Sequence, residues 1–400
     1  DYKSFFYPSI GLSAILTSMF NAPDWLTYLK VRGSYTEVGN SYGRFMTTVT
    51  YPYDEQTQSW TSTSSYPNTK LKPERTKSWE VGLDARILND ISLNLTYYRS
   101  NTYNQTFYAD LSLSSGYSNI PIQSGNIMNE GLEMSLGYNK QWKDFSFNTN
   151  YTLTWNKNRV KRLADGVYNY ATGQSIQMPE LSPLTYGHTD ARLILRVGGS
   201  MGDVYGQRLL KRDLNGYILN EEGVGLAMEN KETYLGSILP KMNMGWSLGF
   251  GYKGVNLGMT FTGRFGGIVI SETQSVLDAA GVSKVSADVR DAGGVQINQS
   301  KVSAQTYYQT IQGTAAYYTY SATNVRLGEL SLSYTLPKKW FDNKVGMTVG
   351  LVGKNLWMIY CKAPFDPELT TSAASNFYQG FDAYMLPSTR NFGFNVKFQF

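Results

Sequence analysis

The stretch from Phe145 to Asn156, which reads FSFNTNYTLTWN, decides the fold of this chain. One parity of the stretch carries all of its apolar and aromatic residues, Phe145, Phe147, Tyr151, Leu153 and Trp155, with Thr149 among them. The other parity is polar and contains only Ser, Asn and Thr. Successive side chains of a β-strand point to opposite faces, so the stretch predicts a strand with one apolar and one polar face.

The same alternation recurs along the whole chain, and we count eleven such segments. Their apolar parities begin near Ile10, Leu29, Trp79, Ile91, Leu132, Phe145, Trp246, Val255, Leu330, Val345 and Phe392. A soluble β-sandwich also alternates, but many of these segments run for about ten residues, whereas strands of soluble proteins average about 5–6. Aromatic residues also cluster near the segment ends, as in the girdles of a membrane barrel. They are Tyr97, Tyr98, Trp142, Trp155, Tyr252, Trp340, Trp357 and Tyr360.

The connections between the segments alternate in length. Short turns are expected at 88–90, 139–144, 253–254 and 337–344, and long loops at about 41–73, 101–123, 161–240, 269–322 and 361–387. Outer-membrane barrels have short periplasmic turns and long extracellular loops. We therefore predict an all-β fold, a transmembrane antiparallel β-barrel, in the outer membrane of a Gram-negative bacterium.

The composition excludes several other classes of protein. Of the 400 residues 42% are hydrophobic and the mean hydropathy is −0.33, and no stretch approaches the ~18 apolar residues of a spanning helix. A single Cys and a single His argue against a disulfide framework, most metal sites and most His-dependent catalysis. The net charge of +5 is scattered, which indicates no nucleic-acid partner. We expect no enzyme activity, no cofactor and no metal.

An odd number of strands places the first and last strand ends on opposite sides of the membrane. Bacterial barrels have an even number, and an open sheet would leave unpaired backbone groups in lipid. We therefore expect residues 1–400 to be the C-terminal portion of one barrel of about 22 strands, completed by an N-terminal half of the same barrel. The alternative is that one strand is missed and the segment closes alone.

Several motifs resemble those of TonB-dependent outer-membrane transporters, in this order along the chain: LKPERTKSWEVGL (71–83), NIMNEGLE (126–133) and KNLW (354–357). Others resemble the SusC/RagA-like branch of these transporters: FYPS (6–9), GGSMGDVYG (198–206), FDPE (365–368) and LPSTR (386–390). The resemblance spans nearly the full chain, although the plug, the TonB-contact box and the first half of the barrel are not recognisable in it.

This resemblance implies active import of a nutrient oligomer, a glycan in preference to a peptide. It implies a SusD-like surface lipoprotein as a lid, TonB acting through the N-terminal region, and outer-membrane lipid around the barrel. An alternative is a passive porin or surface adhesin, which would lack the plug and TonB box. A third is a soluble or fibrous β scaffold, which would stay monodisperse without detergent.

Aromatic residues in the long loops are candidates for contact with the substrate or the lid, because aromatic faces stack on sugars and anchor interfaces. We select Trp60, Tyr66, Tyr168, Tyr170, Tyr307, Tyr308, Tyr317, Tyr318, Phe377, Tyr378 and Phe381. Packing within the loops is the competing interpretation. The last segment ends on an aromatic residue and resembles a barrel-assembly signal, formed by Phe394, Val396, Phe398 and Phe400.

Two short patterns mimic enzyme motifs. GFGYKG (249–254) fits a dinucleotide-binding pattern, but it lies inside an expected strand and not before a helix. GGSMG (198–202) fits a nucleophile elbow, but the single His precedes the Ser. Neither pattern predicts catalysis.

Overall fold

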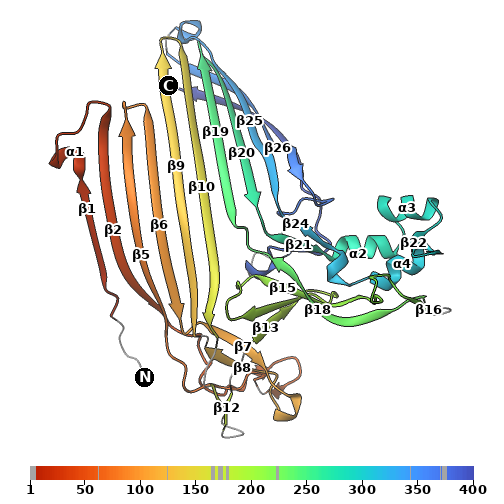
Figure 1. The fold of residues 1–400 in the computed structure, drawn as a ribbon. Helices are drawn as coiled ribbons and strands as arrows, with labels where there is room; N and C mark the ends of the chain where they lie inside the picture. The colour runs from red at the N-terminus through yellow and green to blue at the C-terminus, as the bar shows by residue number, and fades with distance from the viewer. Residues whose placement is uncertain are drawn as a thin grey trace.

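The computed structural model describes residues 6–61, 63–123, 125–163, 167–169, 174–176, 180–221, 225–342, 344–369, 371 and 376–400. Eleven long strands form one antiparallel sheet in which each strand pairs with the next along the chain (Figure 1). They are β1 (Ser9–Ile15), β2 (Leu26–Asn40), β5 (Glu74–Ile87), β6 (Ile91–Tyr103), β9 (Asn126–Trp142), β10 (Phe145–Arg162), β19 (Met242–Tyr252), β20 (Val255–Phe265), β25 (Asn324–Thr335), β26 (Gly346–Cys361) and β28 (Asn391–Gln399). The predicted antiparallel fold is confirmed, and the sheet remains open between β1 and β28.

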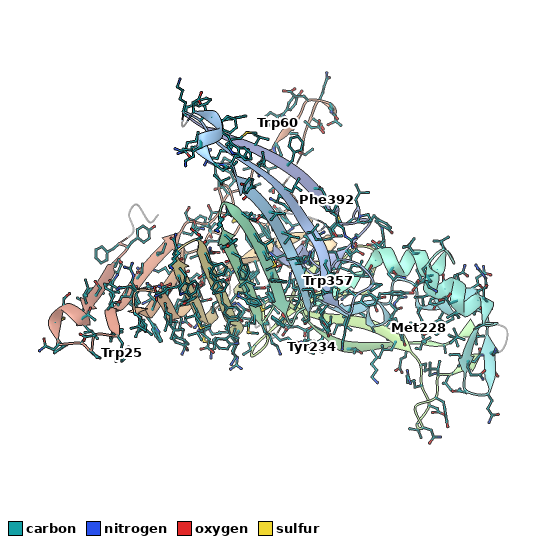
Figure 2. The ribbon with its side chains drawn as sticks, turned by 90° about the horizontal axis from the view of Figure 1, so that it is seen from above. Trp25, Trp60, Met228, Tyr234, Trp357 and Phe392 are labelled. Atoms are coloured by element: carbon teal, nitrogen blue, oxygen red, sulfur yellow. The ribbon has the colours of Figure 1, made fainter. Side chains whose placement is uncertain are left out.

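The strand register gathers the apolar parity of every strand on one face. Residues paired directly across neighbouring strands point the same way. One such row runs across five strands through Leu136, Tyr151, Trp246, Phe261 and Leu327. The sheet therefore has a continuous apolar face, which we call the outward face, and a polar face behind it. Figure 2 shows the sheet from above, with Trp357 on it and Trp60 well apart from it.

The short connections all lie at one end of the sheet. The Lys253–Gly254 turn has positive φ at both residues (46° and 89°), which suits the right-handed twist of a two-residue hairpin. The expected six-residue turn at 139–144 is shorter in the structure, because β9 and β10 stay paired as far as Trp142 and Phe145. The polar run after Tyr138 therefore belongs to the strands and not to the turn.

The long connections lie at the opposite end and run over 41–73, 104–125, 163–241, 266–323 and 362–390. Residues 163–241, 266–323 and 362–390, where described, form a folded unit that we call the loop cap. Its strands include a four-stranded sheet of β13 (Glu180–Thr185), β14 (Arg192–Arg196), β15 (Asp203–Leu210) and β18 (Met228–Ser237), and a three-stranded sheet of β24 (Thr319–Ser321), β21 (Ile268–Ser271) and β27 (Phe381–Asp382).

Smaller elements complete the long connections and the turns. The remaining strands are β3 (Tyr53–Asp54), β4 (Ser59–Trp60), β7 (Thr106–Asp110), β8 (Asn119–Gln123), β11 (Val167–Asn169), β12 (Gln174–Ile176), β16 (Asn220–Glu221), β17 (Gly225–Leu226), β22 (Val295–Ile297) and β23 (Ser300–Val302). The α-helices are α1 (Leu16–Met19), α2 (Glu272–Ala279), α3 (Lys284–Asp291) and α4 (Ala304–Ile311), and the 3-10 helices are η1 (Leu113–Ser115), η2 (Ala315–Tyr317), η3 (Lys338–Phe341) and η4 (Asn376–Tyr378). Helices α2, α3 and α4 each begin after a serine, Ser271, Ser283 or Ser303, whose side chain accepts a backbone N–H of the first turn.

Most of the densely packed core lies at the long-connection end. The largest fully buried hydrophobic side chains include Tyr186, Leu193, Val204, Ile238 and Ile270, which belong to the loop cap. The outward face of the sheet instead exposes large apolar residues such as Trp246 and Leu351. This inversion is expected when lipid, and not protein, covers the apolar face of the strands.

Candidate functional site

Several contacts attach the loop cap to the sheet, and the first to be described lies on β10. The GGSMG turn runs back along the end of that strand, where Val160 N–H donates to Gly199 O at 2.8 Å and Gly198 N–H donates to Val160 O at 2.8 Å. The side-chain oxygen of Asn158 accepts the Met201 N–H at 2.7 Å. The pattern that mimics a nucleophile elbow is therefore an attachment turn, and its glycines and Ser serve packing.

A buried carboxylate fixes the shape of this turn. Asp203 accepts the Ser200 N–H at 2.8 Å and the Tyr234 hydroxyl at 3.1 Å. Gly199 has no room for a side chain, because a Cβ there would lie 2.6 Å from Asp203 Oδ2. Burial raises the pKa of Asp203 despite these two hydrogen bonds, and burial together with the nearby carboxylate raises the pKa of Tyr234 to about 12.

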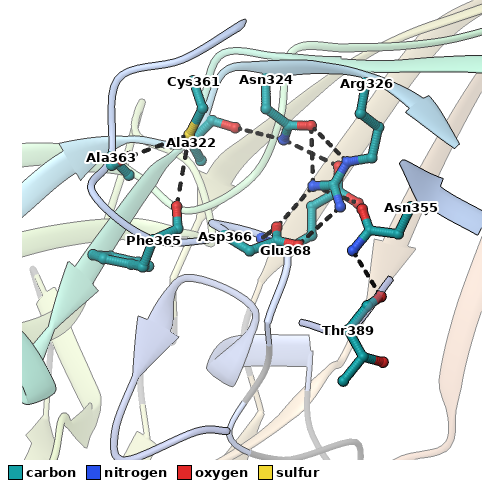
Figure 3. A network of polar contacts seen from close by, with 10 residues as sticks. All are labelled: Ala322, Asn324, Arg326, Asn355, Cys361, Ala363, Phe365, Asp366, Glu368 and Thr389. Carbon is teal, nitrogen blue, oxygen red and sulfur yellow. Dashed lines mark hydrogen bonds and ion pairs between the residues drawn. The ribbon is translucent and has the colours of Figure 1, made fainter. Parts of the chain in front are cut away.

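The second attachment is a buried ion pair at the rim of the sheet (Figure 3). Arg326 on β25 donates to both oxygens of Asp366, at 2.7 and 2.9 Å, and lies 3.4 Å from Glu368. Asn324 joins the pair by donating to Glu368 Oε1 at 3.1 Å and accepting from Arg326. The FDPE motif is thus explained as a loop anchor, because a bidentate pair fixes both position and orientation.

The charge state of this anchor is determined by the guanidinium. Burial alone would raise the pKa of Asp366, but hydrogen bonds from Arg326 and from the Glu368 backbone N–H lower it overall. In the neighbouring KNLW motif, Asn355 adopts a positive φ of 54° and its amide donates to Thr389 O of the LPSTR motif at 3.2 Å. The motifs that carry the family resemblance therefore hold loops on the barrel rim.

Two predicted contact residues lie in the first long connection. Trp60 ends β4, is 71% exposed and contacts the Tyr53 ring at 5.1 Å between centroids. Tyr66 is half-buried and packs edge-on against Tyr117 at 5.1 Å. Figure 2 shows Trp60 standing clear of the sheet. Trp60 is thus accessible within the first long connection.

Four predicted tyrosines gather around α4 in the loop cap. Tyr308 and Tyr318 are buried within a hydrophobic cluster, and Tyr307 and Tyr317 pack against it. The rings of Tyr307 and Tyr308 meet edge-on at 5.2 Å, and the Tyr317 hydroxyl accepts the Leu210 N–H at 3.0 Å. Burial raises the pKa of Tyr318 strongly. Here these rings are packed within the loop.

The predicted residues Phe377, Tyr378 and Phe381 gather around Tyr186. Phe381 is buried against the Tyr186 ring at 5.2 Å, and Tyr378 meets that ring edge-on at 6.1 Å. The buried Tyr186 hydroxyl donates to Phe377 O at 2.7 Å, and burial raises its pKa. This cluster joins two connections that lie far apart in the sequence.

The remaining two candidates are Tyr168 and Tyr170. Tyr168 lies in β11, which pairs with β12, and its side chain lies outside the described residues. Tyr170 lies outside them entirely. The predicted aromatic residues therefore do not form one cluster, and a role in contact with substrate or lid remains a prediction for each of them.

The polar face of the sheet carries a ladder of charged side chains. Arg32 donates to Thr96 Oγ1 at 2.6 Å and lies 3.4 Å from Glu80 and 3.8 Å from Asp84. Asn94 donates to Asp84 as well. Such a wall offers hydrogen-bond donors and acceptors to a hydrated, polar cargo.

The predicted assembly residues Phe394, Val396 and Phe398 lie on β28, which Phe400 follows directly. This strand pairs with β26, with Leu351 opposite Phe394, and none of the described strands covers its other edge. All four of these side chains are exposed. The assembly role remains a prediction.

Other kinds of site were also sought. The described residues contain no group of three or more His, Cys, Asp or Glu side chains that could hold a metal ion. In the same part of the chain, no helix has the length and apolar character needed to cross a membrane.

Comparison with known proteins gives the family. The sequence pattern of the family described as "TonB dependent receptor-like, beta-barrel" matches residues 1–356. The chain belongs to this family. It is therefore an outer-membrane β-barrel protein, as the alternating strands predicted.

Individual relatives of this TonB-dependent receptor chain agree. It is 25% identical to TonB-dependent receptor P3 of Formosa agariphila over 436 residues, covering 99% of this chain and 42% of that protein. It is 27% identical to TonB-dependent receptor SusC of Bacteroides thetaiotaomicron over 154 residues, covering 38% and 14% of the two chains. The predicted SusC/RagA-like resemblance is confirmed by these relatives and the family match.

Solved structures show the same fold. The RagAB peptide importer in its closed-closed state superposes with a TM-score of 0.70 at 18% identity, covering 98% of this chain and 43% of that one. The chain therefore spans less than half the length of the first relatives it matches.

The sequence did not reveal the residues that attach the loop cap. Arg326 and Asn158 look like ordinary polar strand residues, and Tyr186 is one loop tyrosine among many. The FDPE and GGSMG motifs were recognised as family features, but their partners on β25 and β10 were not. The two acidic residues that flank Pro367 in the FDPE motif, which do not have the spacing of metal ligands, were the available indication that a cationic partner was needed.

Proposed function

We propose that this chain forms part of the wall and the extracellular loop cap of an energised importer of nutrient oligomers. TonB supplies the energy through another part of the protein, and a SusD-like lipoprotein covers the loop cap. The cargo is moved without being changed. The observation that carries the proposal is the family match over residues 1–356, together with long, folded connections at one end of the sheet.

The polar face and the accessible aromatic residues favour a glycan over a peptide as cargo. Arg32, Glu80 and Asp84 present hydrogen-bonding groups along the wall, and Trp60 in the first long connection presents a ring that is 71% exposed. Sugars combine hydroxyl groups with apolar ring faces that stack on aromatic side chains, which is the combination available here. A peptide importer is the second candidate, because the RagAB structures share this fold.

Uptake by cells that carry the intact protein tests both levels of the proposal. Labelled oligosaccharides and oligopeptides are offered to the strain, to a deletion strain and to a strain without TonB. We expect oligosaccharide uptake that needs both the protein and TonB. Uptake that persists without TonB would indicate a passive porin, and uptake of peptides alone would leave the import function intact but overturn the glycan assignment.

The contribution of Trp60 is tested in the same assay. Trp60→Ala should weaken apparent affinity about tenfold, as expected for the loss of one stacked ring, whereas Trp60→Tyr should retain most of it. Trp340→Ala is the matched control, because that ring is 67% exposed but lies in the short connection between β25 and β26 at the opposite end of the sheet. Equal uptake by Trp60→Ala and wild type would remove Trp60 from the substrate path.

A further inference from the structure

A groove of about 630 Å³ lies where the loop cap meets the sheet. Its lining includes Trp155, Lys157 and Arg159 at the end of β10, the 198–200 turn, and Tyr234 of β18. Glycines at 198, 199, 236, 266 and 267 leave stretches of its lining without side chains. Backbone free of side chains lets a bulky group approach closely.

Three of the lining side chains point to the outward face. Trp155 stands in register with Leu132, which pairs in turn with Tyr97, so these three side chains share the apolar face. Lys157 and Arg159 have the parity of Trp155 and point the same way. The groove is also lined by Asn156 and Asn158 of the other parity, so it lies at the edge between the two faces.

The depth of the groove corresponds to the headgroup layer of the outer leaflet. Trp155 belongs to the aromatic girdle, which marks the boundary of the hydrocarbon. A strand rises about 3.3 Å per residue, so Lys157 and Arg159 lie about 7 and 13 Å further along the strand, less after tilt. Those positions lie on the long-connection side, away from the short turns.

The charge of the groove favours an anion. The Lys157 ammonium is 3.7 Å from the Glu130 carboxylate. The strand register places Arg99 directly opposite Glu130 as well, so this one carboxylate serves two cations. The described residues offer Arg159 no ion-pair partner. The carboxylate of Asp203 is already engaged by two donors, Ser200 N–H and Tyr234 OH. An uncompensated cation at headgroup depth attracts the phosphates of anionic lipids.

We propose that this groove binds a phosphorylated glycolipid of the outer leaflet, with Lys157 and Arg159 at its phosphate and the exposed ring of Tyr234 against its sugar. The lipid would then bridge the barrel wall and the 198–203 turn. Lys157 and Arg159 point away from the polar face, so this binding does not depend on the identity of the cargo.

The test uses the intact protein in lipid nanodiscs and a lipid A-type glycolipid, either phosphorylated or enzymatically dephosphorylated. Retained lipid is measured by native mass spectrometry. We expect the phosphorylated form to bind more tightly, and Lys157→Gln and Arg159→Gln each to weaken binding about fivefold, as for one cation near an anionic surface. Lys157→Arg should bind like wild type. The double variant Lys284→Gln with Arg290→Gln is the control, because it removes two exposed cations from α3.

Three results would overturn the proposal. One is equal binding of the phosphorylated and dephosphorylated lipids by the wild-type protein, which needs no variant. Another is unchanged binding by Arg159→Gln in protein that still migrates as a folded barrel. The third is an equal loss in the α3 control, which would show that net charge, and not this groove, holds the lipid.

Discussion

Replacing Asp366 by Ala should release the loop that the FDPE motif anchors. The side chains of Arg326 and Asp366 are only 11% and 8% exposed, and removing one partner of a buried pair typically costs about 3–5 kcal/mol. Arg326 keeps two weaker partners, Glu368 at 3.4 Å and Asn324 at 3.2 Å. We therefore expect an effect at or just below the lower end of this range, about 2–3 kcal/mol.

Hydrogen exchange of the intact protein measures this loss locally. A cost of about 2–3 kcal/mol raises the open population of the segment about thirty- to 150-fold, with a matching rise in the exchange rates of residues 362–369. The Glu368 N–H is left out, because it donates to Asp366 Oδ1 and loses its acceptor directly. Exchange within the long strands should stay slow, since the barrel ladder is not touched.

Two further variants complete the experiment. Asp288→Ala removes a carboxylate of the same charge from an exposed pair with Lys284 and should change little. Replacing both Arg326 and Asp366 by Leu should restore part of the protection, because no buried charge is left unpaired. If Asp366→Ala leaves exchange of 362–369 unchanged in a folded barrel, the ion pair does not anchor the loop.

The remaining predictions concern pH and the two faces of the sheet. The folded-state pKa of Asp366 is lowered, so its contribution is fully present above the unfolded value near 3.8 and is lost as pH falls through the lower folded value. Exchange of 362–369 corrected for intrinsic rate should therefore stay constant from neutral pH to about 4, and loosening that begins near pH 6 would contradict this assignment. Leu95→Arg places a charge on the outward face at a cost of about 2–4 kcal/mol near mid-membrane, whereas Asn150→Arg places it on the polar face. Heat-modifiable migration on gels should show a loss of folded barrel for Leu95→Arg alone, and equal losses would show that the two faces are wrongly assigned.

The sequence by itself determined the strands, their faces and the end at which the connections are long. Each strand contacts lipid on one side and polar surroundings on the other, so apolar and polar residues alternate along it with a period of two. The eleven strands follow one another in the sheet in chain order, and local pattern therefore suffices to order them. The turn at 139–144 was misjudged because strands that extend past the membrane lose the apolar parity on which the pattern depends.

Only the tertiary structure decided how the loop cap is built. Its decisive contacts join Asn158 to Met201 across 43 residues, Arg326 to Asp366 across 40, and Tyr186 to Phe377 across 191. No periodicity in the sequence records such pairings, because each depends on two connections that meet only after the strands have aligned. For the same reason the sequence selected aromatic loop residues by type, and the structure separated the exposed Trp60 from the buried Tyr308, Tyr318 and Phe381.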